Sequence, residues 1–282
     1  MSSQCAPEIH PVLEQWPGRV LVSFDGSPGA GRAVEWAVRE VAARGSSLRV
    51  GSSALHPTCF DRRGADDRQE QRLSRLLCEL RDEHPSLVVE LTAIDGDCRS
   101  DLIEEAGDAD LLVLAASNQE SAEAVLLGSL ARRALRRSPC PVVVVRGARN
   151  GPMRRIVVGV DGSSAAGAAI DWACHEANLH RAGPLLVIHS RERDTSWAEA
   201  GCVLDLAVNE CRARTGARVR GVLVEGSPAS ALIDASRTAD IVAVGSRGSS
   251  GFKTVLFGSV ALSVAEGAHC PVAVTHPALQ RD

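Results

Sequence analysis

The sequence predicts an α/β protein made of two tandem, doubly wound domains, each with a five-stranded parallel sheet. Three observations carry this prediction. The chain of 282 residues is long enough for two domains of ordinary size. Its two halves repeat the same motifs in the same order. In the second half, short apolar runs alternate with helical patterns, which is typical of parallel strands covered by helices on both faces.

The duplication shows in matched segments at a nearly constant offset. The segment Val20–Ser27, which ends in Asp-Gly-Ser, recurs as Ile156–Ser163 with the same ending. A repeat period of this length indicates two similar domains rather than a solenoid of short units. The other matched pairs are Ala33–Ala37 with Ala169–Ala173, Ala109–Val113 with Ala239–Ala243, Leu127–Ser129 with Phe257–Ser259, and Cys140–Val144 with Cys270–Val274.

The domain boundary is expected in Gly147–Pro152, a stretch of turn-forming residues without an apolar period. We therefore expect a first domain over residues 17–147 and a second over residues 153–282. Residues 1–16 lack a regular pattern and are expected to form a loose N-terminal arm.

The elements of the second half follow the order βαβαβαβαβ. The β-branched run Ile156–Val160 ends at Asp-Gly-Ser, which indicates a buried strand followed by a helix cap. Gly183-Pro184 ends the first helix. Further strands are expected at 185–189, 219–224, 241–244 and 272–275, and further helices at 197–215, 227–236 and 259–267. The first helix has one apolar stripe of Ala165, Ala169, Trp172, Ala173 and Ala177, with Glu176 and Asn178 outside it.

Composition limits the possible partners. The net charge of −4 argues against a protein that binds polyanions through bulk charge. One arginine run is either an anion patch or a solvated face that suits the end of a helix, and we favour the solvated face because no aromatic residues interleave with it. We therefore expect no nucleic-acid partner. The run consists of Arg132, Arg133, Arg136 and Arg137.

The nine cysteines show no C-x-x-C spacing, and neither a secretion signal nor an apolar run of about 20 residues is visible. These features predict a soluble, cytoplasmic, reduced protein without a membrane partner. Cys174 and Cys202 lie among apolar neighbours and are expected to act as small core residues. Because the cysteines and the eight histidines lack ligand spacing, no metal site is expected.

A glycine-rich loop near the C-terminus predicts an anion-binding site. Gly245 and Gly248 follow an apolar run with G-x-x-G spacing, and Gly258-Ser259 follows after nine intervening residues, where a helix begins. Glycine lets backbone N–H groups approach a phosphate, and a helix N-terminus adds unpaired donors and a positive dipole. Ser259 can cap this helix or bond a phosphate oxygen. Glycines that only form turns are the alternative.

The predicted topology brings this loop to a second motif. In doubly wound sheets, ligands bind beyond the carboxyl ends of the strands, where the strand order reverses. Asp161 ends the first strand of the second half, and Gly245 ends the fourth. If those strands are neighbours, the loop holds phosphates while Asp161 accepts hydrogen bonds from an adenosine group. Alternatively, Asp161 only caps the next helix.

Other residues of the loop leave the chemistry open. Lys253, the only lysine of the chain, either neutralises a terminal phosphate or is solvated. Arg247 either reaches phosphate or pairs with a carboxylate. The segment is not a P-loop, because Phe252 separates Gly251 from Lys253. No base or nucleophile converges on the loop, so no catalytic residue is assigned and any hydrolysis is expected to be slow.

With the glycine loop, the Asp-Gly-Ser turns and the Cys-Pro-Val strands in place, the chain resembles a tandem universal stress protein of the ATP-binding type. The resemblance runs from about Gly18 to His276. The family motif is G-x-x-G, nine residues, then G-(S/T), and the second half matches it throughout. The resemblance implies a Rossmann-like fold of the adenine nucleotide alpha hydrolase class and ATP, with Mg²⁺, as ligand. It further implies a regulatory role in stress, dormancy or starvation.

The resemblance also implies which residues bind the nucleotide. Adenosine lies near Asp161 and the end of the second strand, and the phosphates lie on the glycine loop. His189 is expected to be a partly buried, hydrogen-bonded histidine rather than a catalytic one. The implied ATP-binding residues are Gly159, Val160, Asp161, His189, Ser190, Val244, Gly245, Arg247, Gly248, Gly258, Ser259 and Val260.

The first half departs from the motif. Ala115 and Asn118 replace the two glycines of G-x-x-G, and their side chains are expected to crowd the phosphate position. Glu120 and Glu123 add negative charge nearby. We therefore expect the first site to be weakened or lost. Its residues are Asp25, Ala115, Asn118, Gly128 and Ser129.

The function implied is that of an ATP-binding regulator whose nucleotide modulates assembly or contact with an unidentified protein partner. Family members often pair through the last strand, so either a homodimer or a pairing of the two halves within one chain is expected. Two alternatives stay open. One is a slow ATPase or another nucleotide-dependent enzyme of the same fold, and the other is a structural dimer with idle pockets.

Overall fold

The computed structural model describes residues 18–53, 66–94, 101–116, 127–147, 151–191, 194–247 and 258–277. In the first half, strands alternate with helices from the first strand onward. The strands are β1 (Arg19–Ser23), β2 (Ser47–Ser52), β3 (Val89–Ala93), β4 (Leu111–Ala115) and β5 (Val142–Val145). The helices are α1 (Pro28–Arg44), α2 (Asp66–Glu83), α3 (Asp101–Glu105), which runs into the 3₁₀ turn Ala106–Asp108, and α4 (Ser129–Arg137).

The second half repeats this alternation, and every strand and helix predicted for it is present. The strands are β6 (Ile156–Val160), β7 (Leu185–Arg191), β8 (Val219–Glu225), β9 (Ile241–Gly245) and β10 (Val272–Thr275). The helices are α5 (Ser164–Leu179), α6 (Trp197–Arg214), α7 (Pro228–Ser236) and α8 (Ser259–Gly267). Because apolar runs and serine caps are local signals, the predicted bounds lie close to these.

The two halves form one ten-stranded sheet with the order β3-β2-β1-β4-β5-β10-β9-β6-β7-β8. Within each half the strands are parallel, and the order reverses next to the first strand, as in a doubly wound fold. β5 and β10 pair antiparallel, with Ala273 opposite Val143. Of the two pairings left open by the sequence, the structure shows the one within the chain.

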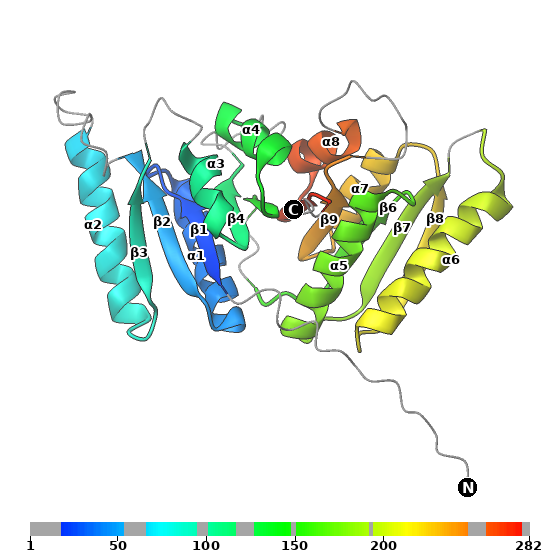
Figure 1. Cartoon of the computed structure of the whole chain (residues 1–282), viewed down its shortest axis with the longest axis horizontal. Helices are drawn as coiled ribbons and strands as arrows, with labels where there is room; N and C mark the ends of the chain where they lie inside the picture. The colour runs from blue at the N-terminus through cyan, green and yellow to red at the C-terminus, as the bar shows by residue number, and fades with distance from the viewer. Residues whose placement is uncertain are drawn as a thin grey trace, which may run out of the picture.

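Helices cover both faces of this sheet, as Figure 1 shows with the first half on the left and the second on the right. One core lies between the sheet and α1, α2, α5 and α6. The other core lies between the sheet and α3, α4, α7 and α8. Trp36 on α1 and Trp172 on α5 occupy equivalent positions in the repeat, and both are buried in the first core.

Two expectations about burial are wrong. Glu176, placed outside the buried stripe of α5, is fully buried, because α5 meets the first half on that side. Cys202, expected in the core, is exposed, because the inward positions of α6 are Ala200, Leu204 and Val208. Cys174 is buried as expected. Among the described residues, no helix is both long and apolar enough to cross a bilayer.

Candidate functional site

The carboxyl ends of β6 and β9 lie side by side. The two strands pair in parallel, with Val158 opposite Ala243, and the strand order reverses between them. This confirms the adjacency on which the predicted crevice depends. The turn that follows β6 and the start of the glycine loop that follows β9 therefore lie at the same edge of the sheet.

The turn after β6 is built by Asp161, Gly162 and Ser163. Gly162 has a φ of 79°, a left-handed conformation that favours glycine. The Ser163 N–H donates to Asp161 Oδ1 at 3.0 Å. Ser163 is the N-cap of α5, because its Oγ accepts from the N–H of Ala166 at 3.2 Å. The capping role considered for Asp161 thus belongs to Ser163, and Asp161 shapes the turn instead.

Ser163 also joins this turn to the glycine loop, since its hydroxyl donates to the backbone oxygen of Arg247 at 3.5 Å. Sequence reasoning did not assign Ser163 to the site. The sequence contains a signal for this role. Both halves have a serine two residues after the aspartate that follows the first strand, namely Ser27 and Ser163.

The end of β7 contributes the next two predicted residues. His189 pairs with Val160 in the sheet register, and its Nδ1 lies 2.8 Å from the Val160 carbonyl oxygen. Because a carbonyl only accepts, Nδ1 carries the proton in this contact. Ser190 donates its hydroxyl to the Gly226 carbonyl at 2.6 Å. Both residues thus lie beside the Asp161 turn, and His189 is hydrogen-bonded as expected.

Two of the predicted glycines serve helix packing. A Cβ on Gly245 would lie 2.5 Å from the carbonyl carbon of Ala165, in the first turn of α5. A Cβ on Gly159 would lie 2.8 Å from Leu232 Cδ1 on α7. Gly245 therefore lets α5 approach the end of β9, and Val244 beside it is buried in the opposite core. At Gly159 and Gly245, the absence of a side chain makes room for protein atoms rather than for a ligand.

The start of α8 lacks a side-chain cap. Gly258 is its N-cap and provides no side-chain hydrogen bond, whereas serines with such bonds cap α1, α5, α6 and α7. The Gly258 N–H donates to the Ser246 carbonyl at 2.8 Å, which closes the base of the loop. The first turn of α8, with Ser259 and Val260, is thus left without a side-chain cap, which is the arrangement that suits an anion. Gly248 and Lys253 lie outside the described residues.

The first half repeats the turn in detail. Ser27 N–H donates to Asp25 Oδ1 at 2.9 Å, and Gly26 has a φ of 77°. Gly128 is the N-cap of α4, which begins at Ser129, and it likewise provides no side-chain hydrogen bond. Asn118, Glu120 and Glu123 lie outside the described residues.

Ala115 packs against the core that contains α1. In the second half, Gly245 on the strand faces Ala165 on the helix. In the first half the equivalent strand residue is Ala115, and the equivalent helix residue is Gly29. The methyl group of Ala115 thus stands where the second half has a methyl group on the helix, and the expected crowding of a phosphate stays a prediction.

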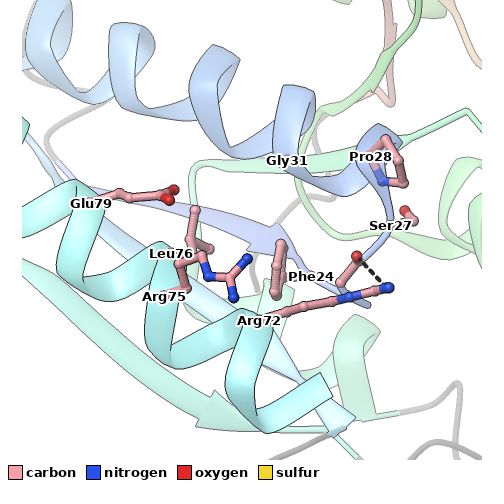
Figure 2. Close-up of a pocket in the computed structure, with 9 residues that line it drawn as sticks. Phe24, Ser27, Pro28, Gly31, Arg72, Arg75, Leu76 and Glu79 are labelled. Carbon is pink, nitrogen blue, oxygen red and sulfur yellow. Dashed lines mark hydrogen bonds between the residues drawn. The ribbon is translucent and has the colours of Figure 1, made fainter. Parts of the chain in front are cut away.

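A hollow of about 360 Å³ lies between α1 and α2 of the first half. Figure 2 shows Phe24 at the end of β1 beside it, with Arg72 reaching the carbonyl oxygen of Gly26 at 2.9 Å. In the second half, Val203 takes the position of Arg72 against the corresponding glycine. The hollow lies on the face of the sheet that α1 and α2 cover, and Gly26 and Ser27 of the turn after β1 form part of its lining.

Comparison with known proteins identifies the repeat. The model of the Universal stress protein family matches residues 18–146 and again residues 152–276. Universal stress protein Rv2623 of Mycobacterium tuberculosis is 28% identical, with 92% of this chain and 97% of that protein covered.

Two solved structures extend this comparison. A universal stress protein from Archaeoglobus fulgidus has a similar fold, with a TM-score of 0.69, 21% identity, and coverage of 92% of this chain and 98% of that one. A universal stress protein solved in complex with cAMP is 27% identical, with a TM-score of 0.39 and coverage of 45% of this chain and 99% of that one. On the two family matches, this chain belongs to the universal stress protein family, with two family domains in tandem.

Proposed function

We propose that this protein is an ATP-binding regulator whose nucleotide, with Mg²⁺, is held mainly by the second domain, in the crevice between the turn after β6 and the start of α8. The observation that carries the proposal is the uncapped start of α8 at Gly258 and Ser259, opposite a switch-point turn. Helices α1, α5, α6 and α7 have serine caps, so among the α-helices whose N-caps the structure describes, only α4 and α8, which follow the motif loops, lack a side-chain cap.

We infer the roles of the residues from this geometry. The backbone N–H groups of Ser259 and Val260 bind phosphate oxygens, with the helix dipole adding to the attraction. Asp161, held by its contact with Ser163, lies at the adenosine end. The intact glycine motif of the second half, which includes Gly248, favours this domain over the first, where Asn118 stands instead.

A regulatory output requires that the nucleotide bind two states of the protein with different affinity. α5 starts at the crevice and ends at the contact between the halves, where Glu176 meets Arg44. We propose that occupation of the crevice acts along this helix on assembly or on an unidentified protein partner. Asp161 accepts a hydrogen bond from Ser163 within its own turn, and His189 is hydrogen-bonded to the neighbouring strand. These contacts favour nucleotide binding over nucleotide hydrolysis.

The test is ATP binding by the full chain, measured by equilibrium dialysis. Gly258→Val places a side chain 3.2 Å from the Ser246 carbonyl, at the base of the loop, and is expected to weaken ATP binding at least tenfold, or about 1.4 kcal/mol. The matched control is Gly128→Val at the equivalent position of the first half, where a Cβ meets nothing within 4 Å. It is expected to leave the main affinity unchanged.

A stoichiometry near one is expected for the unaltered chain. Equal losses in the two variants, no loss in either, or a wild-type stoichiometry of two would contradict the assignment to the second domain. Phosphate release measured over hours separates a binding protein from a slow ATPase.

A further inference from the structure

A cluster of buried charges joins the C-terminal end of α1 to that of α5. Each half supplies a glutamate and, four residues later, a basic residue. These are Glu40 and Arg44 in the first half and Glu176 and His180 in the second, at equivalent positions of the repeat. Symmetry-related residues of the two halves thus meet at one point, away from the nucleotide crevice at the other end of α5.

Each basic residue contacts both glutamates. Arg44 Nε lies 2.6 Å from Glu40 Oε1, and the same guanidinium bonds Glu176 Oε1. His180 Nε2 lies 3.0 Å from Glu40 Oε2 and 3.4 Å from Glu176 Oε2. Arg44 therefore holds one oxygen of each carboxylate, and the other oxygen of each points toward the imidazole.

The three atoms opposite Arg44 have the composition and spacing of a metal site. One ligand atom from each of Glu40, Glu176 and His180 lies within 4.8 Å of the other two, and both Oε2 atoms face His180 Nε2. Metal bonds of about 2.0–2.1 Å in a tetrahedron separate the ligand atoms by roughly 3.3 Å, which matches the two distances to Nε2. Glu176 provides a second observation: its side chain is fully buried, and its Oε2, although 3.4 Å from His180 Nε2, makes no hydrogen bond.

We propose that Glu40, Glu176 and His180 bind a divalent transition-metal ion, Zn²⁺ or one of similar preference, at the contact between the two domains. One imidazole and two carboxylates suit zinc better than magnesium or calcium, which take oxygen ligands. Arg44 lies on the other side of both carboxylates from the ion. It acts as a positioning residue that orients them, as outer-shell partners of metal ligands do.

The charges define how the ion is held. Two carboxylates balance the divalent ion, and the buried Arg44 then leaves one positive charge in excess. Three protein ligands leave a fourth position for solvent, and a hydroxide there restores neutrality. The His180 side chain is 14% exposed, so solvent reaches part of the imidazole. The competing occupant is a proton on His180, whose binding likewise gives a neutral cluster.

His175 also faces the cluster, with Nε2 3.5 Å from the Arg44 guanidinium. It is not among the three converging ligands. The sequence expectation of no metal site rested on local spacing, and the glutamates of this site lie in different halves of the chain.

The repeat supplies the variants for the test. His180→Arg gives the second half the residue that the first half has, so the ionic contacts can persist while the imidazole ligand is lost. Arg44→His gives the first half the residue of the second, which removes the excess positive charge and adds a second imidazole.

The experiment uses the full chain, treated with chelator and then titrated with Co²⁺ and with Zn²⁺. The wild type is expected to bind one equivalent and to give the strong visible absorption of tetrahedral Co²⁺. His180→Arg is expected to abolish that absorption with little change in thermal midpoint, and Arg44→His to tighten binding about tenfold or more.

No tetrahedral Co²⁺ spectrum in the wild type would overturn the proposal. So would equal binding by wild type and His180→Arg, or an absorption dominated by sulfur-to-metal charge transfer, which would place the ion on cysteines. Circular dichroism of each variant checks that the fold is retained.

Discussion

The first and second halves build the same strand-to-helix junction with one methyl group exchanged between neighbours. In the second half the strand carries Gly245 and the helix carries Ala165, while in the first half the strand carries Ala115 and the helix carries Gly29. The first glycine of a G-x-x-G motif can therefore serve packing rather than phosphate. Loss of that glycine in one half does not by itself show loss of a binding site.

The core beneath the junction is expected to give the largest effect when altered. Trp172→Ala removes a side chain that is 2% exposed and should destabilise the protein by about 3–5 kcal/mol. Trp36→Ala is the matched change in the first half, where the ring is 7% exposed, and it should cost a similar amount. Urea unfolding of both variants measures the comparison. A cost below about 1 kcal/mol for only one of the two variants would show that the two tryptophan positions are not equivalent.

The second half of this fold was predictable in detail because its signals are local. Apolar runs such as Ile156–Val160, serine caps such as Ser227, and the duplication itself determine the elements and the switch point. The crevice between β6 and β9 followed from these elements together with the general rule for doubly wound sheets.

Contacts between elements that are distant in the sequence were not predictable in the same way. The burial of Glu176 depends on Arg44, a residue of the other half that no local pattern connects to it. The exposure of Cys202 depends on which face of α6 meets the sheet. The packing role of Gly245 becomes visible only when Ala165 is placed against it.

The exchanged methyl group gives the second prediction. Gly245→Ala adds a Cβ that would lie 2.5 Å from the backbone of Ala165, and overpacking of this kind should cost about 1–3 kcal/mol. Ala165→Gly combined with it recreates the pair found in the first half. The combination should recover part of the loss, with a coupling of about 1 kcal/mol in a double-mutant cycle.

Urea unfolding of the two single variants and the double variant provides the cycle. Strict additivity would show that the two positions do not compensate each other. In that case the pair Ala115 and Gly29 of the first half would need another explanation.

The smallest expected effect concerns the two serine caps. Ser27→Ala and Ser163→Ala each remove an N-cap bond, of 3.1 Å to Ala30 and 3.2 Å to Ala166, and should each cost about 1 kcal/mol. Ser163→Ala also removes the bond from the hydroxyl to the Arg247 carbonyl, which joins the turn to the glycine loop. The two substitutions should therefore resemble each other in urea unfolding and differ in ATP binding.

Ser163→Ala should weaken ATP binding several-fold, whereas Ser27→Ala should leave it unchanged. An equal effect on ATP affinity would mean that both turns take part in binding, and the proposed asymmetry between the halves would then be wrong.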